Sequence, residues 1–128
     1  MIRKFAMFAA ACMMSAHLCG CVALVAGAAG GIGTATWLSG KLSQEVNASF
    51  SRSLEGTKSA LNSLHLKVTK ETVKEDVAQI LSNYSDGRMI WIDIHHVSDT
   101  ISRVEIRVGA GGDKAAAHRN MDAILRHL

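Results

Sequence analysis

The chain has 128 residues and an apolar content of 48%, which fits one folded domain rather than a disordered polymer. Its 14 Lys and Arg residues nearly balance its 11 Asp and Glu residues, for a formal net charge of +3. A balance this even provides no basic stripe for phosphate groups, so we expect no nucleic-acid partner.

Residues 1–20 have the pattern of a removable secretory leader. Arg3 and Lys4 supply a positive start, and residues 5–18 form an apolar segment that is short for a membrane span. The segment ends in Leu18-Cys19-Gly20-Cys21, which resembles the lipidation and cleavage signal of bacterial lipoproteins. The resemblance implies cleavage before Cys21 and acylation of this cysteine, so that membrane lipid is the first expected partner.

All three cysteines lie within the first 21 residues, so Cys21 would be the only one left after cleavage. One cysteine excludes an intrachain disulfide and a thiolate metal site. Val22 rather than Asp follows Cys21. By analogy with lipoprotein sorting in enteric bacteria, this favours the outer over the inner membrane, with the domain in the periplasm.

Residues 22–40 carry no charge, and with Cys21 we interpret them as a Gly- and Ala-rich tether between the lipid and the domain. Two alternatives stay open. The turn Gly27–Gly33 resembles the dinucleotide-binding turn of short-chain dehydrogenases, although Ala26 replaces the family's Thr, and it would imply an enzyme. The small residues that recur every fourth position would instead suit a membrane-embedded oligomer; they are Ala23, Gly27, Gly31 and Ala35.

Residues 41–128 are long enough to bury one modest core, and we predict that they form a small α+β domain. The spacing of Leu38, Leu42 and Val46 favours a first strand, although a helix would also fit. Apolar residues at steps of four and three then predict a helix that begins near Ser49. The stripe consists of Phe50, Leu54, Thr57, Leu61 and Leu64.

Two strands are expected after this helix. Residues 66–70 alternate between apolar and polar side chains, which predicts a short strand. Residues 77–85 fit a helix or a strand by periodicity, and we favour a strand because Asp86-Gly87 provides a tight turn behind it.

The next two strands are predicted to form a hairpin, because apolar residues alternate along 90–94 and again along 104–108. Aligning the two apolar faces requires a loop with an odd number of residues. We place this loop at residues 99–101, because Asp93 then lies opposite Arg107 and His95 opposite Glu105.

The chain ends in a predicted helix with Asp113 as its N-cap. Its apolar stripe consists of Ala117, Met121, Ile124, Leu125 and Leu128. The full order is strand, helix, four strands, helix. This order predicts an antiparallel sheet of about four to five strands with both helices on one face.

Several of these features together resemble a known family. Leu61 and Leu64 end the first helix just before the Leu-x-Val strand at residues 66–68, and the run at residues 103–109 precedes Gly112-Asp113. With the leader and the tether, this pattern resembles the small bacterial lipoproteins of domain-of-unknown-function family 3568. The resemblance implies the location and the fold, and it supplies no activity or catalytic position.

The histidines do not form a convincing metal site. His95 and His96 are neighbours on a strand, so their side chains point to opposite faces. His118 and His127 lie half a turn out of phase on the last helix, and His118 with Asp122 lacks a third ligand. We therefore expect no metal and no cofactor.

The polar residues also offer no catalytic group. Glu105 lies between Arg103 and Arg107 on a solvated face, and no Gly-x-Ser-x-Gly motif is present. We therefore expect a protein that is not an enzyme.

One sheet face has the composition of a docking surface. A tryptophan and a methionine share it with a ladder of charges, and no helix is predicted to cover it, unless the tether or Trp37 does so. These residues are Met89, Trp91, Asp93, His95, Arg103 and Arg107. We expect a lipid-anchored envelope protein whose domain has a binding or structural role, with another envelope protein as its partner.

Overall fold

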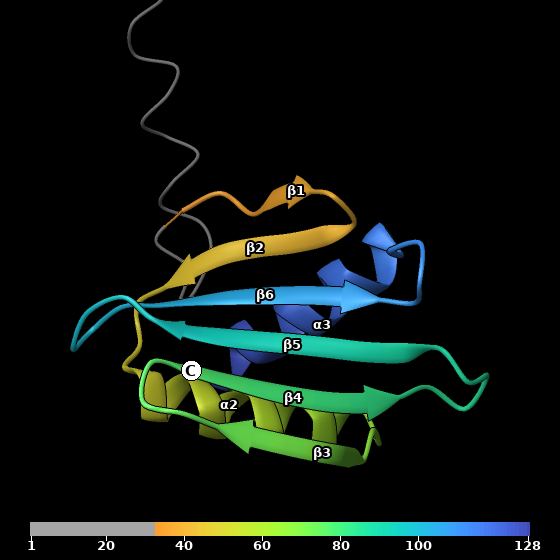
Figure 1. Ribbon diagram of the computed structural model, residues 1–128, viewed down its shortest axis with the longest axis horizontal. Coiled ribbons are helices and arrows are strands. Elements are labelled where there is room, and N and C mark those ends of the chain that lie inside the picture. Colours follow the sequence, from red (N-terminus) through yellow and green to blue (C-terminus); the bar gives the residue numbers. More distant parts are fainter. Residues whose placement is uncertain (1–32) are drawn as a thin grey trace, which may run out of the picture.

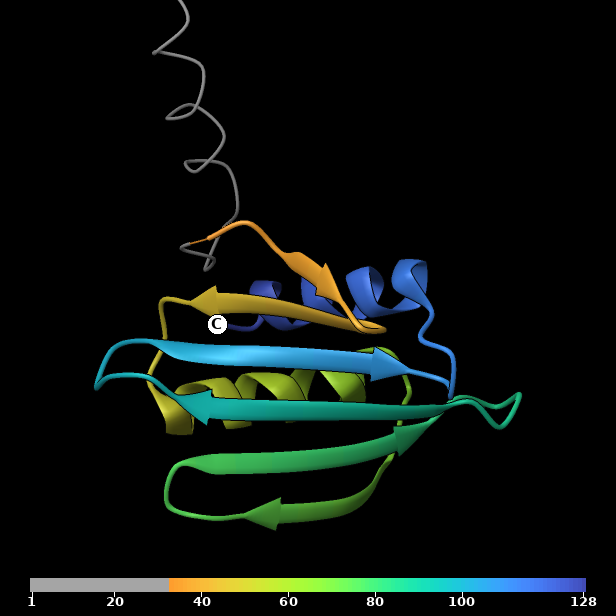
Figure 2. The same cartoon turned by 45° about the horizontal axis from the view of Figure 1, so that its top comes forward.

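The computed structural model describes residues 33–128, which form a six-stranded antiparallel sheet with two helices on one face (Figures 1 and 2). The α+β class and the order strand, helix, four strands, helix are confirmed, with one further short strand at the start. The strands are Thr36–Leu38 (β1), Lys41–Val46 (β2), Val68–Val73 (β3), Val77–Asn83 (β4), Met89–His96 (β5) and Ser102–Val108 (β6). The helices are Phe50–Ser63 (α2) and Lys114–Arg126 (α3).

The connections explain how this order closes one sheet. The strands lie in the order β1-β2-β6-β5-β4-β3, so α2 carries the chain from β2 to the far edge of the sheet. The strands β3, β4, β5 and β6 then return side by side until β6 pairs with β2. Both helices end up behind the sheet in the view of Figure 1, and no helix of residues 33–128 lies on the opposite face.

Strand β1 lies within the segment predicted to be a tether, and it raises the number of strands above the expected four to five. Ser39 and Gly40 both have positive φ, at 53° and 79°, and they turn the chain back so that β1 pairs with β2. Trp37 lies opposite Leu42 in this pairing. The end of the uncharged segment is therefore an extended strand at Thr36–Leu38.

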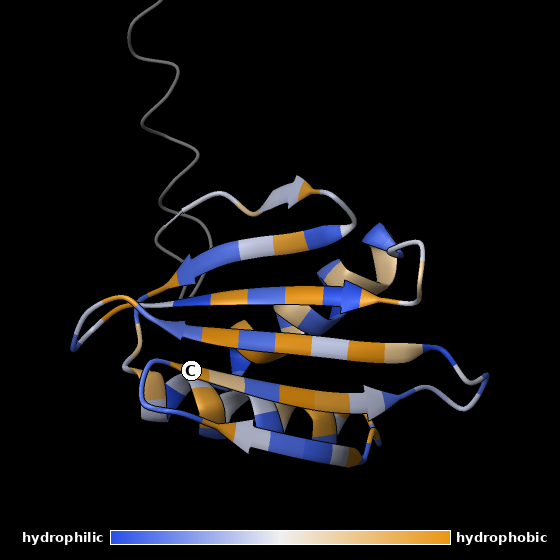
Figure 3. Cartoon of the chain, viewed as in Figure 1, coloured by the Kyte–Doolittle hydropathy of each residue, from blue (hydrophilic) through white to orange (hydrophobic). Residues whose placement is uncertain are grey.

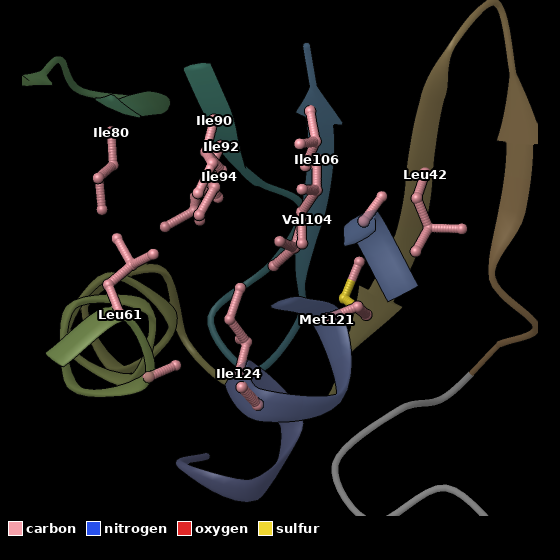
Figure 4. Close-up of a cluster of buried hydrophobic side chains, with 14 of the residues drawn as sticks. Leu42, Leu61, Ile80, Ile90, Ile92, Ile94, Val104, Ile106, Met121 and Ile124 are labelled. Carbon is pink, nitrogen blue, oxygen red and sulfur yellow. The ribbon is translucent and has the colours of Figure 1, made fainter. Parts of the chain in front are cut away.

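The core lies between the sheet and the two helices (Figure 4). The predicted alternation along residues 90–94 and 104–108 is confirmed, because every second residue is fully buried. Leu61 of α2 and Met121 and Ile124 of α3 pack against these strands from the helix side of the sheet, which is the lower side in Figure 4. Burial of each such side chain contributes about 1.5–3 kcal/mol to the hydrophobic free energy of folding.

Both helices begin at the predicted caps, because the side chains of Ser49 and Asp113 accept hydrogen bonds from backbone N–H groups in the first turn. The buried face of α2 differs from its predicted stripe: Leu64 is 36% exposed and the buried residues are mostly small. The reason is the close approach of α3 and of the residues that follow it: a Cβ on Gly56 would lie 2.7 Å from Leu128 Cδ2 and 3.1 Å from His127 O. The buried residues are Ser53, Gly56, Thr57, Ala60 and Leu61.

The predicted register of the hairpin is wrong by two residues. Asp93 lies opposite Glu105, and His95 lies opposite Arg103. The loop spans residues 97–101, where two backbone N–H groups donate to Ile101 O at 3.0 and 3.2 Å. Because the loop has an odd number of residues, both apolar faces stay on the core side, as predicted. The loop itself is two residues longer than predicted. Lys41 on β2 lies near both facing carboxylates and offsets their repulsion.

The strand predicted at residues 77–85 is confirmed as β4, followed by a turn in which Gly87 has a φ of 89°. Strand β3 begins two residues later than predicted and continues to Val73. All six of its residues are exposed, because it forms the outer edge of the sheet. No helix of residues 33–128 is both long and apolar enough to cross a membrane.

Candidate functional site

The sheet face that points away from α2 and α3 carries all six residues predicted to form a docking surface. We call it the open face. Along β5 and β6 these residues alternate with the buried core residues, which Figure 3 shows as alternating bands of hydropathy. Each of the six is half-buried; they are Met89, Trp91, Asp93, His95, Arg103 and Arg107. The strand pairing aligns Trp91 with Leu81 on one side and Arg107 on the other.

Two carboxylates meet at the centre of the open face. Asp93 and Glu105 lie opposite each other, and Lys41 Nζ lies 3.8 Å from Asp93 Oδ2 and 3.9 Å from Glu105 Oε2. Gln79 Nε2 donates a hydrogen bond to Asp93 Oδ1 at 2.9 Å. Lys41 and Gln79 were not predicted, and their alternation with Leu42 and Ile80 is the only sequence signal that places them here.

Arg103 and His95 also lie near Glu105. Arg103 Nε lies 3.4 Å from Glu105 Oε1, and His95 Nε2 lies 3.4 Å from Glu105 Oε2. Arg107 instead donates to the carbonyl of Ala110. The buried ring nitrogen Nε2 of His95 and the Nε atoms of Arg103 and Arg107 have no hydrogen-bond partner within residues 33–128.

Trp91 borders a shallow hollow of about 370 Å³ on the open face, together with Lys41, Asp93 and Arg107. Trp37 does not cover this hollow. Because Trp37 lies directly opposite the buried Leu42, both side chains lie on the helix side of the sheet, and Trp37 packs against the core. The indole of Trp91 thus stays half-buried, among side chains of both charges.

The other candidate residues stay apart. The ring of His96 packs edge-on against Phe50 at 6.5 Å between centroids, and His127 Nδ1 lies 2.8 Å from Ala123 O. His118 and Asp122 form no ion pair with any described residue. In the described part of the chain, no three His, Cys, Asp or Glu side chains are arranged to hold a metal ion.

The predicted lipidation motif lies outside the described residues, as does most of the glycine-rich segment. This applies to Leu18, Cys19, Gly20 and Cys21, and to Ala23, Gly27 and Gly31. Gly33 is described, and its carbonyl accepts a hydrogen bond from Gln44 Nε2 at 3.2 Å. Ala35 packs against the core, so both residues belong to the domain.

Two comparisons with known proteins bear on the identity of the chain. No curated protein matches it. The model of a family described as "Protein of unknown function (DUF3568)" matches residues 4–127, which is nearly the whole chain. The match includes every strand and helix of the domain and most of the predicted leader. The chain therefore belongs to this family, as its sequence pattern predicted.

Proposed function

We propose that this protein is a lipid-anchored component of the bacterial cell envelope, and that its domain docks another envelope protein through the open face. The observation that carries the docking role is Trp91, a half-buried tryptophan on a sheet face that neither α2 nor α3 covers. Tryptophan and arginine are the residues that most often dominate binding energy at protein interfaces.

The surroundings of Trp91 support a protein partner. Leu81 and Arg107 flank the indole, so an incoming side chain would meet an apolar centre with a charged rim. Lys41, Asp93 and Glu105 present both signs of charge close together, which favours one orientation of a complementary surface over general attraction. The proposed role is binding, and the contacts that other side chains of the face make with both carboxylates support it.

The proposed anchor rests on the motif Leu18-Cys19-Gly20-Cys21 at the end of an apolar segment. Intact mass spectrometry of the protein from its native membranes should give a chain that begins at Cys21 and carries acyl chains. A Cys21→Ser variant should lack this added mass and leave the membrane fraction. An unmodified chain that retains Met1 would contradict the anchor, and fractionation of the two membranes tests the preference for the outer one.

The proposed docking face can be tested by photocrosslinking in cells. A photoreactive amino acid at Leu81, beside Trp91, should capture one defined protein, and the same group at Asp122 on the helix side should not. The purified partner should then bind the full chain with an affinity that Trp91→Ala weakens by about 2 kcal/mol or more, while Arg126→Ala leaves it unchanged. Equal crosslinking from positions 81 and 122, or unchanged affinity of the Trp91→Ala variant, would contradict the docking face.

A further inference from the structure

A second hollow lies away from the open face, where three segments distant in the sequence come together. Its walls are the connection between α2 and β3, the end of β4 with its turn, and one residue of α3. Its volume of about 580 Å³ falls in the range of small-molecule pockets. Leu64 and Leu66 supply apolar surface, and Lys67, Tyr84 and Arg119 supply polar groups.

The charges around this pocket are of one sign. Lys67 and Arg119 line it, and no carboxylate is among its lining residues. Neither Lys67 nor Arg119 forms an ion pair with any of residues 33–128. Two other basic residues are paired, because Arg88 binds Asp86 and Asp113 and Lys58 binds Glu55 and Glu71. The pocket therefore keeps two cations without a direct ion-pair partner among residues 33–128, and the charge of Arg119 also helps to lower the pKa of Asp113.

Tyr84 adds a positioned hydrogen-bond donor. The amide of Asn120, which is 1% exposed, donates to the Tyr84 hydroxyl oxygen at 2.8 Å and to Ala116 O at 2.9 Å. Both amide hydrogens are thereby used, so the hydroxyl hydrogen of Tyr84 needs another acceptor, and it has none among the described residues. The guanidinium carbon of Arg88 lies 4.8 Å from the ring centroid and holds the ring from one side.

We propose that this pocket binds a phosphate group attached to a small apolar body. Lys67, Arg119 and the Tyr84 hydroxyl are three donors for the terminal oxygens of a phosphate, and Leu64 and Leu66 contact the apolar part. The phosphate could come from a soluble phosphate ester or from a phospholipid headgroup. The pocket shares no lining residue with the hollow beside Trp91. A negative result for phosphate binding would therefore leave the proposed docking function untouched.

Tyr84 is the only tyrosine of the chain, which gives the pocket a reporter of its own. The full chain, labelled with 3-fluorotyrosine in dodecyl maltoside micelles, should show one ¹⁹F resonance. Phenyl phosphate should shift this resonance saturably, and phenol, which has the same ring without the phosphate, should not. Arg119→Gln and Lys67→Gln should each weaken binding by about five-fold. Arg126→Gln, on the last turn of the same helix, should leave binding unchanged.

The absence of a shift with both phenyl phosphate and phosphatidylglycerol, an equal response to phenol, or full binding by the Lys67→Gln/Arg119→Gln variant would overturn the proposal. To identify the source of the phosphate, the same fluorine resonance is measured in micelles that contain phosphatidylglycerol. Micelles that contain diacylglycerol, which has no phosphate, are the control. A shift with phosphatidylglycerol alone supports a lipid headgroup. A shift with phenyl phosphate but not with this lipid supports a soluble ester.

Discussion

At the scale of single residues, Gly112 is the position where two loops touch. It has a φ of 78°, and a Cβ built there would lie 2.6 Å from Gly40 O and 2.7 Å from Gly40 Cα. Backbone atoms cannot move aside as the end of a side chain can. We expect Gly112→Ala to lower the free energy of unfolding by about 2–4 kcal/mol, because it combines left-handed strain with a backbone clash. Urea unfolding followed by circular dichroism measures this loss.

Gly111 is the matched control for that substitution. A Cβ at Gly111 would have no neighbour within 4 Å, and its φ is not positive. We expect Gly111→Ala to change the free energy of unfolding by no more than about 0.5 kcal/mol. Equal losses in the two variants would contradict the specific cost expected for a Cβ at Gly112.

At the scale of elements, α3 begins at a cap that also carries a charge. Asp113 Oδ1 accepts a hydrogen bond from Ala116 N at 3.0 Å, and Arg88 Nη1 lies 2.5 Å from Asp113 Oδ2. The hydrogen bond from Ala116 and the positive charge of Arg88 hold the pKa of Asp113 below its ordinary value of 3.8. A lowered pKa in the folded state means that ionised Asp113 stabilises the fold above pH 3.8, and that this contribution is lost as pH falls through the folded-state pKa.

The variant Asp113→Asn tests this linkage, because asparagine keeps the capping acceptor and removes the charge. We expect the wild-type chain to be the more stable at neutral pH, with a difference that shrinks as the pH falls below 3.8. Chemical unfolding at a series of pH values measures the difference. Asp122→Asn, at an exposed position on the same helix, should not reproduce the pattern, and a difference that does not vary with pH would contradict the linkage.

The elements also show how far the sequence alone can lead. The sequence predicts which residues of β5 and β6 face the core, because isoleucines and valines occupy every second position of both strands. The register was not, since the pairing of Asp93 with Glu105 depends on Lys41 from another strand. The buried face of α2 was missed for a similar reason: its small residues make sense only where α3 packs against them.

The same distinction applies to the open face and to the phosphate pocket. Strand alternation placed six residues of the open face correctly, because it is a local property. Lys41 and Gln79 join them only because β2 lies beside β6 and β4 beside β5, an order that no local pattern records. The pocket was not anticipated at all, since Lys67, Tyr84 and Arg119 come from three separate segments.

For the molecule as a whole, the pairing of β1 with β2 shows that the folded domain begins before residue 41. Ala35 and Trp37 pack against the core, and β1 covers the outer edge of β2. We expect residues 33–128 to fold as a stable monomer. A chain of residues 41–128 should be less stable by about 1–3 kcal/mol, because it loses the buried part of Trp37 and three residues of β1.

Urea unfolding of the two shortened chains measures this difference, and gel filtration reports their oligomeric state. Trp37→Ala in the longer chain is the control, since it removes the indole and keeps the strand. Equal stability of the two chains would mean that β1 adds nothing to the domain. Oligomers of residues 33–128 would contradict the expectation of a monomer.

The exposed outer edge formed by β3 could pair with the same edge of a second copy of the chain at high concentration. A second copy that extends the sheet through a two-fold axis keeps the same face outward, so residues of equal parity must pair across the junction. At the centre of β3 this sets Lys70 against Lys70 or Glu71 against Glu71. Like charges that face each other across such a junction repel, so the centre of this edge discourages strand exchange and fibril growth.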